Sequence, residues 1–203
     1  MNTPASEGLA RGFPSGHGRV EPRAKFLFRN GRKFFIKGVT YGPFRPSSPG
    51  VFLPEPATTE KDLRLIRDLG ANTVRLYHVP PGWFLDLCAQ HDLLVMPTIP
   101  WPQHINFLDD RTTRLEIHKT VAAGVGMNGD HPAVLAYLVG NEIPADTVRW
   151  YGLARVRGFV ESLIETAKDH APQSLVTYAN YPSTEYLIPA NQDFFCFNLY
   201  LED

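Results

Sequence analysis

The feature that most constrains this fold is a repeated alternation of short apolar runs and longer amphipathic segments. We expect strands at residues 37–41, 73–77, 93–99, 134–140, 175–178 and 194–200. Helices are expected to start near Thr58 or Thr59, at Pro81 and at Asp110, and the longest is expected to run from about Thr147 to His170. Continuously apolar strands that alternate with helices predict a parallel sheet covered by helices.

A different pattern precedes the first of these strands. Residues 26–36 read FLFRNGRKFFI, in which two β-prone runs flank Asn30-Gly31 and predict a β-hairpin. Residues 1–24 are rich in Gly, Pro, Ser and Arg and lack the apolar run of a secretory signal, so we expect a flexible tail. The expected domains are therefore a tail at 1–24 and a folded unit at 25–203.

Two parallel architectures compete, the open doubly wound sheet and the (β/α)8 TIM barrel. A doubly wound nucleotide-binding fold places a Gly-rich turn after its first strand, and Gly42-Pro43-Phe44 is not that turn. Polar and aromatic residues instead follow the carboxyl ends of several strands, where barrels keep their active sites. We predict a partial TIM barrel of about six βα units with an N-terminal β-hairpin, because a full barrel needs ~250 residues.

Charge and composition narrow the partners. The 20 Lys and Arg residues nearly balance the 21 Asp and Glu residues, and no block of Lys and Arg stands out, which favours neither a nucleic acid nor an anionic membrane. No apolar run approaches the ~18 residues of a membrane span, so we expect a cytoplasmic chain. The histidines lack metal-ligand spacing and the two cysteines are expected as thiols, so no metal or cofactor is predicted.

The sharpest chemical signal is Asn141-Glu142, at the end of the fourth expected strand. Glycoside hydrolysis needs a carboxylic acid beside the leaving oxygen, and a partly buried strand-end Glu favours the protonated form. We therefore predict Glu142 as a catalytic acid/base, with Asn141 binding a sugar hydroxyl. The alternative is a solvated loop glutamate that caps the next helix.

Other candidates lie at neighbouring strand ends. Arg75 sits inside an apolar strand and needs a partner, either an active-site carboxylate or a structural ion pair. Asn198 and Tyr200 end the sixth strand, where the phenol could orient a catalytic carboxylate or simply pack at the barrel mouth.

Aromatic residues near the same end are candidates for sugar binding. We predict that Tyr77 and Trp101 contact substrate, and we consider His104 and Trp150 as further loop residues that could support a sugar ring. Core packing is the alternative for each of them.

The chain resembles a known group at these residues. Residues 28–41 (FRNGRKFFIKGVTY), 62–76 (DLRLIRDLGANTVRL), 131–143 (HPAVLAYLVGNEI) and 193–200 are similar to the catalytic barrel of family-2 glycoside hydrolases, the β-galactosidase, β-glucuronidase and β-mannosidase group. Three shorter motifs (GVTYGPF, VPP and YANYP) are similar to barrel domains placed ahead of a family-2 glycosyltransferase in bacterial polysaccharide-synthesis proteins.

The resemblance implies a retaining two-carboxylate mechanism that hydrolyses O-glycosidic bonds. Glu142 would be the acid/base, and a nucleophilic Glu would end a seventh strand supplied by a downstream segment or a separate chain. Glu202 lies two residues beyond the sixth expected strand and is not predicted to be that nucleophile. The alternatives are a non-catalytic glycan-binding or accessory domain of a polysaccharide-synthesis protein, and a non-functional gene fragment.

Overall fold

The computed structural model describes residues 18–200, and its centre is a set of six parallel strands. The first three strands are β4 (Gly38–Thr40), β5 (Thr73–Leu76) and β6 (Leu94–Pro97), and the last three are β7 (Ala136–Asn141), β8 (Leu175–Asn180) and β9 (Cys196–Phe197). Parallel bridges Val95–Val134 and Thr98–Leu138 join β6 to β7. The strands therefore follow one another in space in their order along the chain, as barrel strands do.

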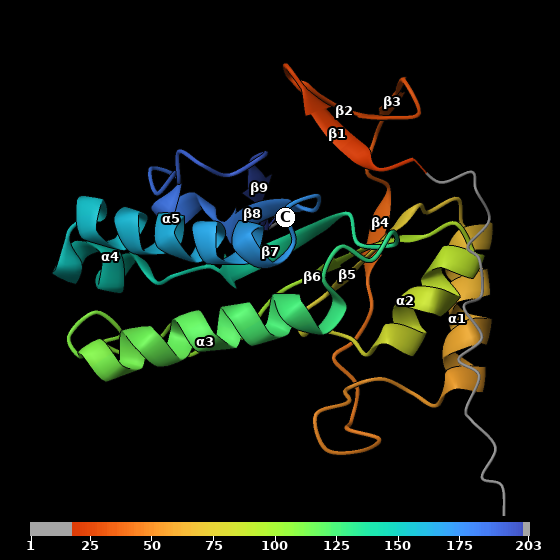
Figure 1. The fold of residues 1–203 in the computed structure, drawn as a ribbon, viewed down its shortest axis with the longest axis horizontal. Helices are drawn as coiled ribbons and strands as arrows, with labels where there is room; N and C mark the ends of the chain where they lie inside the picture. Colours follow the sequence, from red (N-terminus) through yellow and green to blue (C-terminus); the bar gives the residue numbers. More distant parts are fainter. Residues whose placement is uncertain (1–17, 201–203) are drawn as a thin grey trace, which may run out of the picture.

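Five α-helices and one short 3-10 helix connect these strands. They are α1 (Pro56–Asp68), α2 (Gly82–Gln90), α3 (Arg111–Asn128), α4 (Ala145–Tyr151), α5 (Leu153–His170) and η1 (Pro182–Thr184). Figure 1 shows α3 and α5 running beside each other and α1 beside α2, both pairs on the outside of the strands. In the described part of the chain β4 and β9 do not pair, so the strands form no closed barrel.

The two faces of the strands belong to two separate apolar clusters. Val74, Val95 and Val139 pack with the helices, whereas Met96 and Leu138 belong to a cluster on the opposite face. This alternation follows from the two-residue period of a strand. Cys88 is buried on the helix side, and both cysteines are free thiols.

A small antiparallel sheet covers the second cluster near the start of the chain. Its strands are β1 (Val20–Arg23), β2 (Phe26–Arg29) and β3 (Arg32–Phe34), and Leu27 and Phe34 pack against the second cluster. The predicted hairpin is confirmed: Asn30 (φ 53°) and Gly31 (φ 73°) both have positive φ, as a type I′ turn requires.

Strand β1 corrects the expected tail at 1–24. Residues 20–23 pair with residues 26–29, although Pro22 and the Gly-rich neighbourhood gave no sign of a strand. Residues 1–17 lie outside the described residues. Pro22 is compatible with β1 because this strand is an edge of the small sheet.

Two predicted helix boundaries are wrong. Helix α1 begins at Pro56, ahead of Thr58 and Thr59, because Pro is favoured in a first turn where its missing N–H costs nothing. The helix expected over 147–170 is two helices, since Gly152 adopts φ 83° between α4 and α5. The predicted cap is confirmed at α3, where the Asp110 carboxylate accepts from the Thr113 N–H at 2.7 Å.

Features that would indicate a membrane span or a metal site do not occur within residues 18–200. None of the helices described there has the length and apolarity to cross a bilayer. That part of the chain also contains no group of three or more His, Cys, Asp or Glu side chains arranged to hold a metal ion.

Candidate active site

Side chains from β5, β7 and the end of β9 meet in one hydrogen-bonded cluster. The Arg75 guanidinium donates to Asn141 Oδ1 at 2.7 Å and to Asn198 Oδ1 at 2.6 Å. Asn198 Nδ2 donates to Asn141 Oδ1 at 2.9 Å and to Glu142 Oε1 at 2.6 Å, and the Tyr200 hydroxyl also donates to Glu142 Oε1. The structure thus brings together five of the residues predicted from sequence.

The backbone of Glu142 is held in an unusual conformation. Its φ is 55°, in the left-handed region that non-Gly residues seldom occupy. Three consecutive N–H groups are each bonded to a different acceptor: Asn141 N–H to Gln103 Oε1 at 2.8 Å, Glu142 N–H to the Ala179 carbonyl at 2.9 Å, and Ile143 N–H to the Tyr178 hydroxyl at 2.7 Å. These bonds offset the cost of the left-handed turn, which is about 1–3 kcal/mol.

The turn aims the carboxylate at β9. Because β7 ends at Asn141 and the chain reverses its φ at the next residue, Glu142 leaves the strand direction and meets Asn198 and Tyr200. Glu142 is half-buried, while Tyr200 is 65% exposed. The hydrogen bond to Glu142 raises the pKa of the Tyr200 phenol above its usual value, so this donor keeps its proton at neutral pH.

The partners of Arg75 differ from the expected carboxylate. Its guanidinium bonds the amide oxygens of Asn141 and Asn198, and it lies 4.8 Å from the ring centre of Tyr77, with which it makes a cation–π contact. Its Nε is buried and without a hydrogen-bond partner among the described residues. Arg75 therefore brings positive charge to the cluster without being neutralised by Glu142.

The Nδ2 group of the Asn141 side chain makes no hydrogen bond within the cluster. Both of its bonds there are accepted by Oδ1, which fixes the side-chain orientation. The Nδ2 group can then donate to a sugar hydroxyl, as the sequence predicted for this residue.

Trp101 does not occupy the predicted sugar-binding position. It is only 7% exposed, its Nε1 donates to the Val139 carbonyl at 2.7 Å, and its ring packs edge-on against Phe107 and Phe159. The indole therefore supports β7 from the helix side. Trp150 is 76% exposed on α4, and His104 is exposed in the loop after β6, so neither belongs to the cluster.

Gln103 and Tyr178 are two residues of the site that the sequence reading missed. Both are buried, at 8% and 1% exposure, and both bond the backbone around Glu142. A glutamine in a loop and a tyrosine inside an apolar strand carry no local signal of this role. Only the spatial closeness of β6, β7 and β8 brings them to the turn.

An open cavity adjoins the cluster along the free strand edges. Its volume is about 930 Å³, and its lining includes Thr40, Arg75 and Met96 from β4 to β6, Phe197 from β9, and Leu27 from the small sheet. The cavity therefore occupies the space between the two strands, β4 and β9, that lack a neighbour on one side.

Comparisons with known proteins agree with this architecture. The chain is 27% identical over 179 residues to a 1,3-beta-glucanosyltransferase of Saccharomyces cerevisiae, covering 82% of this chain and 38% of the relative. It is 32% identical over 128 residues to an exo-beta-D-glucosaminidase of Streptomyces avermitilis, covering 58% and 14%. The chain thus spans well under half the length of these relatives.

The solved structures establish the fold. A β-glucuronidase from Ruminococcus gnavus, in complex with D-glucuronic acid, superposes with a TM-score of 0.75 at 15% identity, over 89% of this chain and 30% of that one. At this identity the likeness concerns the arrangement of strands and helices. The finer resemblances, to family-2 hydrolases and to domains ahead of glycosyltransferases, stay predictions.

The match to a family extends over nearly the whole described chain. Residues 19–200 fit the family described as glucanosyltransferase, glycoside hydrolase family 72, and this span includes every member of the Arg75–Glu142 cluster. The chain belongs to the glucanosyltransferase family, glycoside hydrolase family 72.

Proposed function

We propose that this chain supplies the acid/base half of a retaining, glycan-transferring active site, with Glu142 as the acid/base. The observation that carries the proposal is the Glu142 carboxylate, fixed at a strand end by Asn198 and Tyr200 and by three backbone bonds. Such rigid placement suits a group that must meet a glycosidic oxygen in one geometry. Family membership points to the same chemistry.

The reaction would proceed in two balanced steps. In the first, a second carboxylate attacks the anomeric carbon, the bond to the leaving oxygen breaks, and Glu142 gives that oxygen its proton. In the second, Glu142 takes the proton of an acceptor hydroxyl, whose oxygen attacks the anomeric carbon and releases the carboxylate. A sugar acceptor gives transfer and water gives hydrolysis, and the family name favours transfer between β-glucan chains.

The second carboxylate is proposed to come from a segment that completes the barrel. Within residues 18–200, Glu142 is the one carboxylate in the hydrogen-bonded cluster. A retaining mechanism requires the two carboxyls ~5–5.5 Å apart. Strands β4 and β9 each have a free edge beside the 930 Å³ cavity, which supports completion by a downstream segment or a separate chain. Glu202, which the sequence analysis set aside, lies outside the described residues.

A non-catalytic glycan-binding role is the second candidate. It is favoured by the same observation, a single carboxylate in the described cluster, together with the Asn141 amide that can bind a sugar hydroxyl. In this case the domain would hold a glycan for a polysaccharide-synthesis partner without breaking a bond.

The test is a product analysis with β-1,3-glucan oligosaccharides of one length. We expect the protein isolated from its natural source to produce both longer and shorter oligosaccharides, and we expect Glu142→Gln to lower the rate by ~10²–10⁴-fold. A glycoside with an activated aryl leaving group needs no protonation, so Glu142→Gln should lower the rate of its first step far less.

The control is Glu165→Gln, which makes the same change at an exposed carboxylate on α5. It should leave the product pattern unchanged. Equal activity of Glu142→Gln and the natural protein on the oligosaccharides would refute the acid/base role. Oligosaccharide binding without turnover, unchanged by Glu142→Gln, would support the glycan-binding alternative.

A further inference from the structure

The small N-terminal sheet carries a concentration of positive charge that the total charge conceals. Residues 18–37 contain seven of the 20 Lys and Arg residues and one of the 21 acidic residues. This segment therefore has a net charge of +6 in a chain whose total is −1, which leaves −7 for the remaining residues. No block of Lys and Arg stands out in the sequence because these cations are interleaved with apolar residues.

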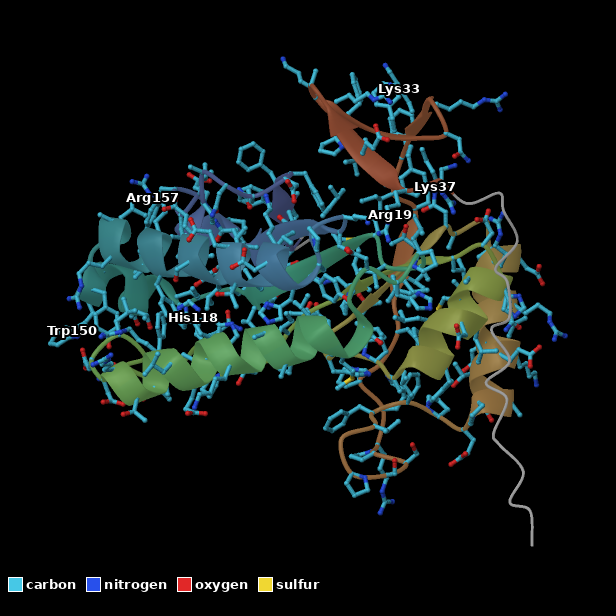
Figure 2. All side chains as sticks on the ribbon, in the orientation of Figure 1. Arg19, Lys33, Lys37, His118, Trp150 and Arg157 are labelled. Atoms are coloured by element: carbon cyan, nitrogen blue, oxygen red, sulfur yellow. The ribbon has the colours of Figure 1, made fainter. Side chains whose placement is uncertain are left out.

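Four of these cations have no carboxylate partner in the part of the chain that the structure describes. Lys25, Arg32, Lys33 and Lys37 are exposed and form no ion pair within residues 18–200. In Figure 2, Lys33 lies in the small sheet away from α3 and α5, and Lys37 lies where the chain leaves that sheet for β4. Their charge is available to a ligand from solvent.

Strand register places cations and aromatic rings together on the outer face of the sheet. Leu27 pairs with Phe34, and both turn inward to the apolar cluster beneath. The alternate positions therefore turn outward, and there Lys33 Nζ lies 3.8 Å from the ring centre of Phe26 and the Arg23 guanidinium lies 5.5 Å from that of Phe28. The rings hold both cations over the sheet. Arg23 is also paired with the exposed Glu21 carboxylate at 2.9 Å, whereas Lys33 forms no ion pair within residues 18–200.

We propose that this outer face (Arg23, Phe26, Phe28 and Lys33, with Lys25 in the turn between β1 and β2, together the basic sheet face) binds an anionic polysaccharide whose carboxylates repeat along the chain. A regular polyanion meets several fixed cations at once, so each weak contact adds to the affinity of the whole chain. The choice of a glycan rests on the proposed function, because a protein of a glycan-acting family meets polysaccharides as its substrates.

The geometry is less suited to other polyanions. A surface that combines cations with apolar residues binds a membrane by inserting the apolar side chains into the lipid. Here a cation lies over the Phe26 ring and another over the Phe28 ring. Single-stranded nucleic acid gains much of its affinity by stacking bases on open aromatic faces, and these cations compete for the same ring faces. The carboxylates of a polysaccharide require only the positive charges of this face.

The test is affinity electrophoresis of the intact protein in gels that contain polygalacturonate, with neutral β-1,3-glucan as the uncharged comparison. We expect retardation by polygalacturonate that weakens with salt, and a loss of affinity of about tenfold in Lys25→Glu/Lys33→Glu. The matched control is Lys61→Glu/Arg111→Glu, which makes the same change in net charge at exposed cations on α1 and α3. The control should remain retarded like the natural protein.

Three outcomes would overturn the proposal. They are equal loss in the control pair, no retardation of the natural protein at low salt, and equal or tighter binding to single-stranded DNA or to vesicles containing phosphatidylserine. Glu142→Gln separates the two proposals, since it should abolish transfer and leave retardation by polygalacturonate intact. Loss of transfer activity in all preparations, with retardation still dependent on Lys25 and Lys33, would leave the basic sheet face standing.

Discussion

The backbone of Glu142 and its carboxylate are held by two regions of very different character. The backbone bonds come from Gln103, Tyr178 and Ala179, all at most 8% exposed. The carboxylate bonds come from Asn198 and Tyr200, which follow β9, and Tyr200 is 65% exposed. The position of Glu142 is thus set by the buried core, and the hydrogen bonding of its carboxylate by an exposed edge.

This difference predicts two kinds of variant. Changes in the buried region should lower both stability and activity, because the same hydrogen bonds satisfy buried groups and hold the turn. Changes at the edge should lower activity and leave stability nearly unchanged, because water can replace the lost partner.

Arg75 joins the two regions, and among the residues that surround Glu142 its removal should have the largest effect on activity. Its guanidinium bridges Asn141 on β7 and Asn198 after β9, so Arg75→Met frees both amides. We expect transfer activity to fall by about 100-fold. The free energy of unfolding should change by only about 1 kcal/mol, since exchanging a partly buried charge for an apolar chain is often neutral.

The measurements are the rate of oligosaccharide transfer and a urea titration. Arg157→Met is the control, because Arg157 lies on α5 and forms only a long 3.8 Å ion pair with Glu161. A large loss of stability in Arg75→Met would contradict this prediction. It would mean that Arg75 mainly supports the fold.

Tyr178→Phe should have the largest effect on stability. It leaves the buried Ile143 N–H without its acceptor, which costs about 2 kcal/mol. Because the left-handed turn at Glu142 loses one of its three bonds, transfer activity should also fall by about tenfold. Tyr186→Phe, at a 48% exposed tyrosine, should change neither quantity. A Tyr178→Phe protein with the natural midpoint in urea and reduced activity would break the proposed coupling.

The architecture could be predicted from the sequence because its signals are local. Alternating apolar runs and helices indicated the parallel strands, Asn30-Gly31 indicated the hairpin, and Asp110 indicated the start of α3. Each of these features depends on a few neighbouring residues. Glu142 and Arg75 were candidates for the same reason, since a polar residue in or after an apolar strand stands out.

The parts of the site that could not be predicted depend on contacts between residues far apart in the sequence. The bond from Asn141 N–H to Gln103 and that from Ile143 N–H to Tyr178 span 38 and 35 residues, and neither partner differs from an ordinary core or loop residue in sequence. Trp101, predicted to contact substrate, lies instead in the core, where its indole N–H donates to the Val139 carbonyl. An aromatic residue after a strand has the same local pattern in either role.

Buried His78 makes the stability of the folded protein depend on pH. It follows β5, is 6% exposed with neither ring nitrogen hydrogen-bonded to a described residue, and lies edge-on to Phe52. Burial lowers the pKa of His78 in the folded protein, so below about pH 6.5 the unfolded state takes up a proton that the folded state resists. Stability should therefore fall as the pH decreases.

His78→Leu tests this contribution. We expect the difference in unfolding free energy between pH 7 and pH 5.5 to be smaller in His78→Leu than in the natural protein by about 1 kcal/mol. Urea titrations at both pH values measure it, and His104→Leu, at an exposed loop histidine, should leave the difference unchanged. If His78→Leu leaves this difference in unfolding free energy unchanged, protonation of another group accounts for the loss of stability at low pH.

Tyr200→Phe should have the smallest effect and isolates the edge. The Glu142 carboxylate loses one donor and keeps the bond from Asn198 at 2.6 Å, so we expect activity to fall only about threefold and stability to stay constant. The pKa of Tyr200 is raised by its bond to Glu142, so the phenol donates across neutral pH and its own titration does not limit activity there. Unchanged activity in Tyr200→Phe would show that Tyr200 only packs beside β9, and a lower midpoint in urea would make the edge as structural as the buried region.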